Sequence, residues 1–123
     1  MKAKLKLVFL CLLGVGFIFA GSMHFIQPHF YMRMMPPPLD QYAALLVNVS
    51  GVCEILGGIG VFIPATRRAA GIGLLALLIA VFPANIYMAV RWDLFTDIGP
   101  RTALLIRLPI QAVIVAWVWW VCL

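Results

Sequence analysis

One carboxylate stands inside an otherwise apolar stretch of the chain. The stretch reads GVCEILGGIGVF from Gly51 to Phe62, and Glu54 is its only residue that is neither apolar nor glycine. On a helix, the residues three and four positions away share a face. Around Glu54 these are all small: Ser50, Gly51, Gly57 and Gly58. Because small residues let helices approach closely in lipid, this face is predicted to point into a helical bundle.

Further polar side chains lie inside similarly apolar stretches: His24, Asn48, Asn85, Arg107 and Gln111. A charged group at bilayer depth costs at least about 2.5–3.5 kcal/mol, so Glu54 needs a partner, water or a proton. We therefore expect these side chains to line a polar intramembrane pocket with Glu54 at its floor. Arg107 and Gln111 are one helical turn apart, and we expect Glu54, Gln111 and Arg107 to form a relay.

Each of these residues also has a plainer interpretation. Arg107 lies near the start of its apolar run and could extend to the lipid headgroups. His24 could be an ordinary interfacial histidine, and Asn48 and Asn85 could bond across helices as structural contacts. Glu54 itself could be a structural residue that is protonated or paired. The pattern alone leaves these alternatives open.

Two prolines flank the polar positions. Pro83 lies two residues before Asn85, and Pro109 lies two residues after Arg107. A proline inside a helix frees a carbonyl one turn back and usually bends the axis. Bends beside polar side chains favour a cavity within the bundle.

The composition defines the solvent in which these residues must sit. The chain has 123 residues, of which 65% are hydrophobic and 11% are charged, whereas a soluble domain is about 45–50% apolar and about 25% charged. A fold of this size has too little interior to bury that surface. The chain is therefore interpreted as an integral membrane protein.

Four apolar runs, at about 5–25, 42–63, 69–90 and 103–123, have the length of about 20 residues that a spanning helix needs. The predicted fold is all-α, a membrane-embedded four-helix bundle forming a single domain over 1–123, with a turn at the three prolines of MMPPPLD. The basic start of the first run also resembles a signal peptide. Its apolar stretch is long for a signal, so we expect it to remain as the first span.

The basic residues predict the orientation. One side carries Lys2, Lys4, Lys6, Arg67 and Arg68, and the other carries only Arg33, Arg91 and Arg101. Because cytoplasmic loops are enriched in Lys and Arg, both termini are predicted to lie in the cytoplasm of a multi-pass protein. The net charge of +5 is explained by this placement, and without a basic stripe carrying aromatics nucleic-acid binding is not indicated.

Catalytic and metal chemistry have little support. The three cysteines, Cys11, Cys53 and Cys122, form no C-x-x-C motif. The sequence offers no nucleophile–base pair, phosphate loop or metal-spaced set of His and Cys. We therefore expect no catalytic residues, no metal site and no enzymatic activity of the chain's own.

Five motifs in order, G-x-x-H-F, E-x-x-G-G, T-R-R-x-A, F-P-A-N-I-Y and R-L-P-x-Q, make most of the chain resemble the DoxX-like family of small bacterial membrane proteins. That resemblance implies a four-helix bundle in the bacterial cytoplasmic (inner) membrane. By motif match it points to His24, Glu54, Asn85, Arg107 and Gln111, without an established role for any of them. Some relatives are linked to redox chemistry of the cell envelope.

The expected function is that of a membrane protein with a polar pocket, acting as an accessory subunit or small-molecule binder in envelope metabolism. A quinone is the candidate ligand, since it suits an apolar cavity with a few placed polar groups. The expected contacts are the lipid bilayer and either a membrane redox partner or a second copy of the chain. The alternative is a small transporter or proton-coupled carrier acting as an oligomer, because buried ionisable groups are typical of such pathways.

Overall fold

The computed structural model describes residues 2–37 and 39–123, and over those ranges every regular element is a helix. Four helices are long and apolar enough to cross a membrane: α1 (Lys2–Ile26), α3 (Ala43–Gly60), α4 (Arg67–Val90) and α5 (Arg101–Cys122). Three short elements join them: α2 (Pro28–Met32) and the 3-10 turns η1 (Leu39–Tyr42) and η2 (Trp92–Leu94). The all-α, four-helix prediction is confirmed. Pro38, the last of the three predicted turn prolines, lies outside the described residues.

The helix ends differ from the predicted ones by a few residues, and one short α-helix, α2, was not predicted. The helix expected to reach residue 63 ends at Gly60, since Phe62 and Ile63 already donate to the carbonyls of Ile59 and Gly60 in a tight turn. Pro28 begins α2, where its missing N–H is tolerated because the first helical residue needs none. This short helix becomes important because it covers the pocket described below.

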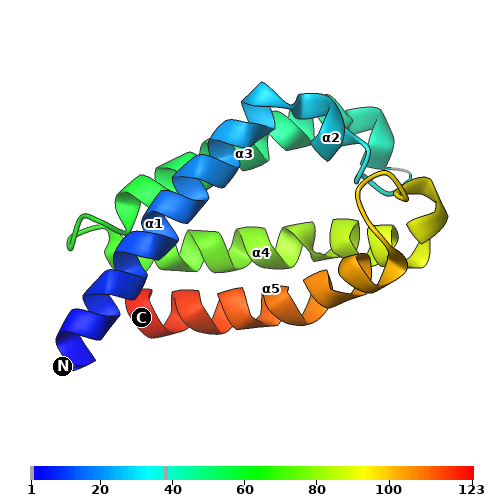
Figure 1. Cartoon of the computed structure of the whole chain (residues 1–123). Coiled ribbons are helices and arrows are strands. Elements are labelled where there is room, and N and C mark those ends of the chain that lie inside the picture. Colours follow the sequence, from blue (N-terminus) through cyan, green and yellow to red (C-terminus); the bar gives the residue numbers. More distant parts are fainter. Residues whose placement is uncertain (1, 38) are drawn as a thin grey trace.

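The long helices form two antiparallel hairpins that diverge from each other (Figure 1). α1 lies along α3, and α4 lies along α5. The hairpins are close together where both termini lie, and they separate toward α2 and the loop around η2. We call these two ends of the molecule the terminal end and the α2 end. Both termini thus share one side, as an even number of spans requires.

Two separate apolar clusters hold the hairpins together. The cluster at the terminal end includes Leu13, Leu74 and Val118, each at most 3% exposed. The cluster at the α2 end consists of Met34, Met88, Phe95 and Leu104. The space between the clusters contains the polar side chains of the bundle.

The predicted glycine face of α3 is confirmed. A Cβ atom on Gly58 would lie 2.7 Å from the carbonyl oxygen of Gly14, and one on Gly51 would lie 3.1 Å from that of Gly21. Both pairs join α3 to α1, and each helix places its two glycines seven residues apart. At these positions the backbones touch, so the glycines fix how α1 is rotated against α3.

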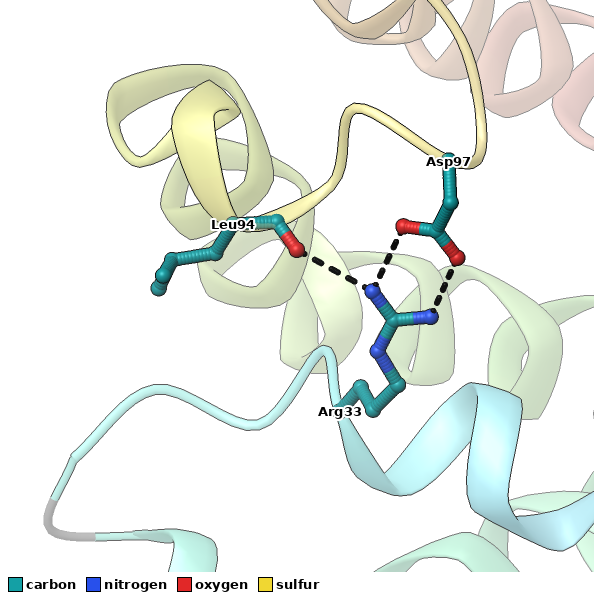
Figure 2. Close-up of polar contacts among 3 residues, drawn as sticks. All are labelled: Arg33, Leu94 and Asp97. Carbon is teal, nitrogen blue, oxygen red and sulfur yellow. Dashed lines mark hydrogen bonds and ion pairs between the residues drawn. The ribbon is translucent and has the colours of Figure 1, made fainter.

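An ion pair fastens the α2 end. Arg33, directly after α2, donates from both terminal nitrogens to the two oxygens of Asp97, each at 2.8 Å, and also to the carbonyl oxygen of Leu94 at 3.0 Å (Figure 2). The guanidinium lies over the ring of Phe95, 5.5 Å from its centre. These contacts tie α2 to the loop that follows α4.

Candidate ligand-binding pocket

Polar side chains from all four long helices meet in one cavity of about 300 Å³, which we call the polar cavity. Its polar lining consists of His24 from α1, Tyr31 from α2, Ser50 and Glu54 from α3, Asn85 from α4 and Arg107 from α5. Apolar side chains, among them Phe30, Met34 and Met35 of the α2 region, complete the wall. The cavity lies in the wedge between the two hairpins, at the α2 end.

His24 and Glu54 face each other across the α1–α3 contact. Nδ1 of His24 lies 2.7 Å from the carbonyl oxygen of Ala20, and a carbonyl can only accept, so Nδ1 carries a proton. Nε2 lies 3.1 Å from Oε2 of Glu54. This distance is within the range of a hydrogen bond, but the contact is too poorly aligned to be one, and Oε2 has no hydrogen-bond partner among the described residues.

A hydrogen bond formed across this contact would need one proton. With Nδ1 protonated, Nε2 of a neutral His24 can only accept, and a carboxylate can also only accept. A bond between them therefore exists either as imidazolium and carboxylate or as imidazole and carboxylic acid. Both forms are neutral overall, which suits a pair held at membrane depth.

Tyr31 extends this pair toward the α2 end. Its ring stacks on that of His24, with ring centres 4.0 Å apart and planes 16° from parallel. Burial raises the pKa of the Tyr31 phenol, and the negative field of Glu54 raises it further, while Arg107 lowers it. Tyr31 is thus a protonated donor that lies within the fields of both charged groups of the cavity. Tyr31 is not among the site residues that the sequence predicts. Its spacing of seven residues from His24 was the available signal.

Asn85 and Gln111 bind each other rather than Glu54. Nδ2 of Asn85 donates to Oε1 of Gln111, and Nε2 of Gln111 donates to the carbonyl oxygen of Leu78. The two amides therefore fasten α5 to α4 on both sides of Pro83, at Leu78 before it and at Asn85 after it, and both helices continue through their prolines. The predicted relay of Glu54, Gln111 and Arg107 is wrong in its pairing, because Gln111 is engaged with α4 and Glu54 faces α1.

Arg107 lines the polar cavity and a smaller neighbouring cavity of about 200 Å³, which Gln111 and Asn85 also line. Among residues 2–37 and 39–123, no carboxylate lies within ion-pair distance of Arg107. Its guanidinium is therefore available as a donor to whatever enters the cavity.

Asn48 is the one predicted site residue that the structure places elsewhere. It lies one residue beyond the buried Val47 and is exposed on the outer face of α3, away from both cavities that contain Arg107. Its predicted helix was correct, but its face could not be assigned until the α1–α3 contact was known. In the described part of the chain, no three His, Cys, Asp or Glu side chains are grouped so that they could hold a metal ion.

Comparison with known proteins places the chain in a family but assigns no activity. The model of a domain of unknown function, DUF8561, matches residues 13–122, and no DoxX family model matches. Searches of the curated proteins and of the solved structures found no match. The chain belongs to the DUF8561 family.

Proposed function

We propose that this member of the DUF8561 family binds a small lipid-soluble molecule in the polar cavity and acts as an accessory subunit or small-molecule binder in envelope metabolism. One observation carries the proposal: His24, Glu54, Asn85 and Arg107 come from four different long helices and converge on one cavity of about 300 Å³. Ligand sites are typically concave, largely apolar and about 300–1,000 Å³ in volume, with a few convergent polar groups.

The chemistry of the lining favours a ring with oxygen acceptors, such as a quinone headgroup. Arg107 offers N–H donors without an acidic partner among the described residues, and Tyr31 offers a phenolic donor. A quinone carries two carbonyl oxygens, each of which requires a donor when it is buried. The volume matches a single substituted ring. The motif resemblance to the DoxX-like family, with its redox-linked relatives, agrees with this ligand class.

A proton-coupled carrier is the second candidate, and the His24–Glu54 contact favours it. Two titratable groups that face each other at 3.1 Å at membrane depth are suited to accept and release a proton as a solute passes. Four spans are few for alternating access, so this function would require an oligomer.

The proposed setting is the bacterial cytoplasmic membrane, with the termini in the cytoplasm and the α2 end outside. Lys and Arg residues favour this orientation, because more of them lie at the terminal end. The polar cavity would then open toward the outer side, where a membrane redox partner or a second copy of the chain could exchange the ligand.

The test is to identify what the protein retains. The chain is purified in a mild detergent, extracted with organic solvent and analysed by mass spectrometry, in parallel with Arg107→Leu, Glu54→Gln and the exposed-loop control Asp93→Asn. We expect a lipid-soluble molecule in the wild type and the control, and its depletion in the two cavity variants. Equal retention by all four proteins would contradict the proposed site, and a polar metabolite would favour the carrier.

A further inference from the structure

The polar cavity is one end of a longer cleft between the hairpins. A second cavity of about 300 Å³ lies between α1 and α5, and its wall is almost entirely apolar, with Leu13, Phe17, Leu78 and Ile114 among its residues. We call it the apolar groove. Glu54 lines both the groove and the polar cavity, so its side chain forms the boundary between the two spaces.

The cavity of about 200 Å³ beside Gln111 borders both of them. It shares Asn85 and Arg107 with the polar cavity, and it shares Leu78 and Ile114 with the apolar groove. The cleft is thus polar at the α2 end and apolar toward the terminal end. This is the polarity profile of an amphipathic molecule.

The groove is closed at the terminal end and open at its side. Nε1 of Trp117, which lines the groove, donates to the carbonyl oxygen of Phe9 at 3.0 Å, and the two rings meet edge to face. This contact joins α1 to α5 below the groove. Above it the α1 wall carries Gly16, where an added Cβ would meet nothing within 4 Å, and Leu12, which is 54% exposed. The side of the groove therefore faces the lipid.

We infer that the apolar groove holds the hydrocarbon tail of the ligand whose polar ring occupies the polar cavity, and that such a ligand enters sideways from the bilayer between α1 and α5. The inference rests on the proposed function and specifies its ligand class as a ring with oxygen acceptors and an attached apolar chain. Glu54 stands where ring and tail join. The tail is the occupant because the groove continues the polar cavity, carries almost no polar lining and stops at the Phe9–Trp117 contact.

Gly16 and Gly73 provide a matched pair of variants. An added Cβ meets nothing within 4 Å at either position, so Gly16→Leu and Gly73→Leu should both fold. Gly16 lines the apolar groove, whereas Gly73 lines a separate space between α3 and α4. Only Gly16→Leu fills the groove, and thermal denaturation in detergent confirms that both variants are folded.

The experiment measures binding of two quinones with the same dimethoxy-methyl ring, one without a tail and one with a decyl tail, at a fixed detergent concentration. We expect Gly16→Leu to lose about tenfold in affinity for the tailed quinone, which corresponds to about 1.4 kcal/mol, or to fewer than two buried methylene groups. Its affinity for the tail-less quinone, and both affinities of Gly73→Leu, should match the wild type.

The outcomes separate this inference from the proposal on which it rests. If Gly16→Leu binds both quinones as the wild type does, or weakens both alike, the groove does not hold the tail, although the polar cavity would still bind the ring. A change of oligomeric state in Gly16→Leu with unchanged binding would assign the groove to a second copy of the chain and overturn the inference. A wild-type protein that binds neither quinone would overturn the proposed function and the inference together.

Discussion

The contact between His24 and Glu54 depends on the backbone around it. Gly21 and Gly51 bring α1 and α3 so close that a Cβ on Gly21 would lie 2.7 Å from the carbonyl oxygen of Gly51. Because the helices are antiparallel, His24 and Glu54 lie on opposite sides of this contact, each beside the glycine of the other helix. Their side chains reach toward each other over the glycines and meet at 3.1 Å. Breaking a buried pair by removing one partner is costly, because it leaves an uncompensated group at depth. Replacing both partners by apolar groups can be nearly neutral.

We therefore predict that His24 and Glu54 are energetically coupled. His24→Phe keeps the ring that stacks on Tyr31 but removes the partner of the carboxyl group. This change alone should destabilise the protein, and adding Glu54→Leu should recover part of the loss. The coupling energy should lie within about 0.5–3 kcal/mol, measured by a double-mutant cycle on thermal unfolding in detergent. Glu54→Leu combined with the exposed-loop change Asp93→Asn is the control and should be additive. Additivity of the first pair as well would show that the contact is not a stabilising interaction.

Only part of the candidate site could be predicted from the sequence. Glu54 and its small-residue face were predictable, because a carboxylate among apolar residues must avoid lipid. Its partner was not predictable, because His24, Gln111 and Arg107 all lie on other helices. Which of them it meets depends on how the helices are rotated and tilted. The charge of Arg107 suggested a pair with Glu54. The glycine contact between α1 and α3 instead brings His24 next to Glu54.

At the scale of the elements, the α1–α3 glycine contact should tolerate no side chain. A Cβ on Gly58 would meet the carbonyl oxygen of Gly14 at 2.7 Å and the backbone nitrogen of Ile18 at 3.0 Å. Neither atom can move without shifting α1. Gly58→Leu should therefore cost at least the roughly 1–3 kcal/mol that is typical of overpacking, seen as a lower melting temperature in detergent.

The adjacent Ile59 provides the comparison, because it is 46% exposed and already carries a large side chain. Ile59→Leu should leave the melting temperature nearly unchanged. Equal tolerance of Gly58→Leu and Ile59→Leu would mean that α3 does not pack against α1 through its glycine face.

The element that the sequence did not predict, α2, is held by the Arg33–Asp97 pair. Hydrogen bonds from Arg33 lower the pKa of the Asp97 carboxyl. A carboxyl group with a lowered pKa stabilises the folded form at pH values above its ordinary pKa. This contribution to stability is lost as the pH falls through the lowered pKa. Because the carboxylate is exposed, the effect should be local, on the attachment of α2, rather than on overall stability.

Hydrogen exchange resolves this local effect. Asp97→Asn should speed exchange in residues 28–35 at neutral pH, while α3 stays protected. After correction for the intrinsic exchange rate, exchange in the wild type should become as fast as in the variant only at a pH below the usual range of carboxyl pKa values. Asp93→Asn is the matched control, since Asp93 lies in the same loop and makes only a 3.5 Å contact with Arg91. Identical exchange in all three proteins would show that the ion pair does not hold α2.

The number and approximate positions of the long helices were predictable from the sequence, but the way they pack was not. Runs of about 20 apolar residues are typical of spanning helices. The fourth run was expected to begin at about residue 103, and α5 begins at Arg101, directly after Gly99 and Pro100. The divergence of the hairpins depends on where the two apolar clusters form. Each cluster gathers residues far apart in sequence, such as Leu13 and Val118 in the cluster at the terminal end.

At the scale of the whole molecule, the orientation in the membrane determines which side the polar cavity serves. A reporter fused after Leu123 should be cytoplasmic, and one inserted beside Asp97 should be outside, because Lys and Arg are more numerous at the terminal end. Reporter activity or accessibility labelling in intact cells distinguishes the two sides. The reverse pattern would place the mouth of the cavity in the cytoplasm.

The central claim is that the wedge between the two hairpins holds a small molecule, and photo-crosslinking tests it most directly. A quinone carrying a photoreactive group on its ring is irradiated with the purified protein in lipid nanodiscs, and the adducts are located by peptide mass spectrometry. The predicted adducts lie on the cavity wall at Tyr31, Met34 and Met35, and excess unlabelled quinone should abolish them. Adducts confined to outward residues of α3 such as Leu45 and Leu56, which are 61% and 63% exposed, would contradict the claim.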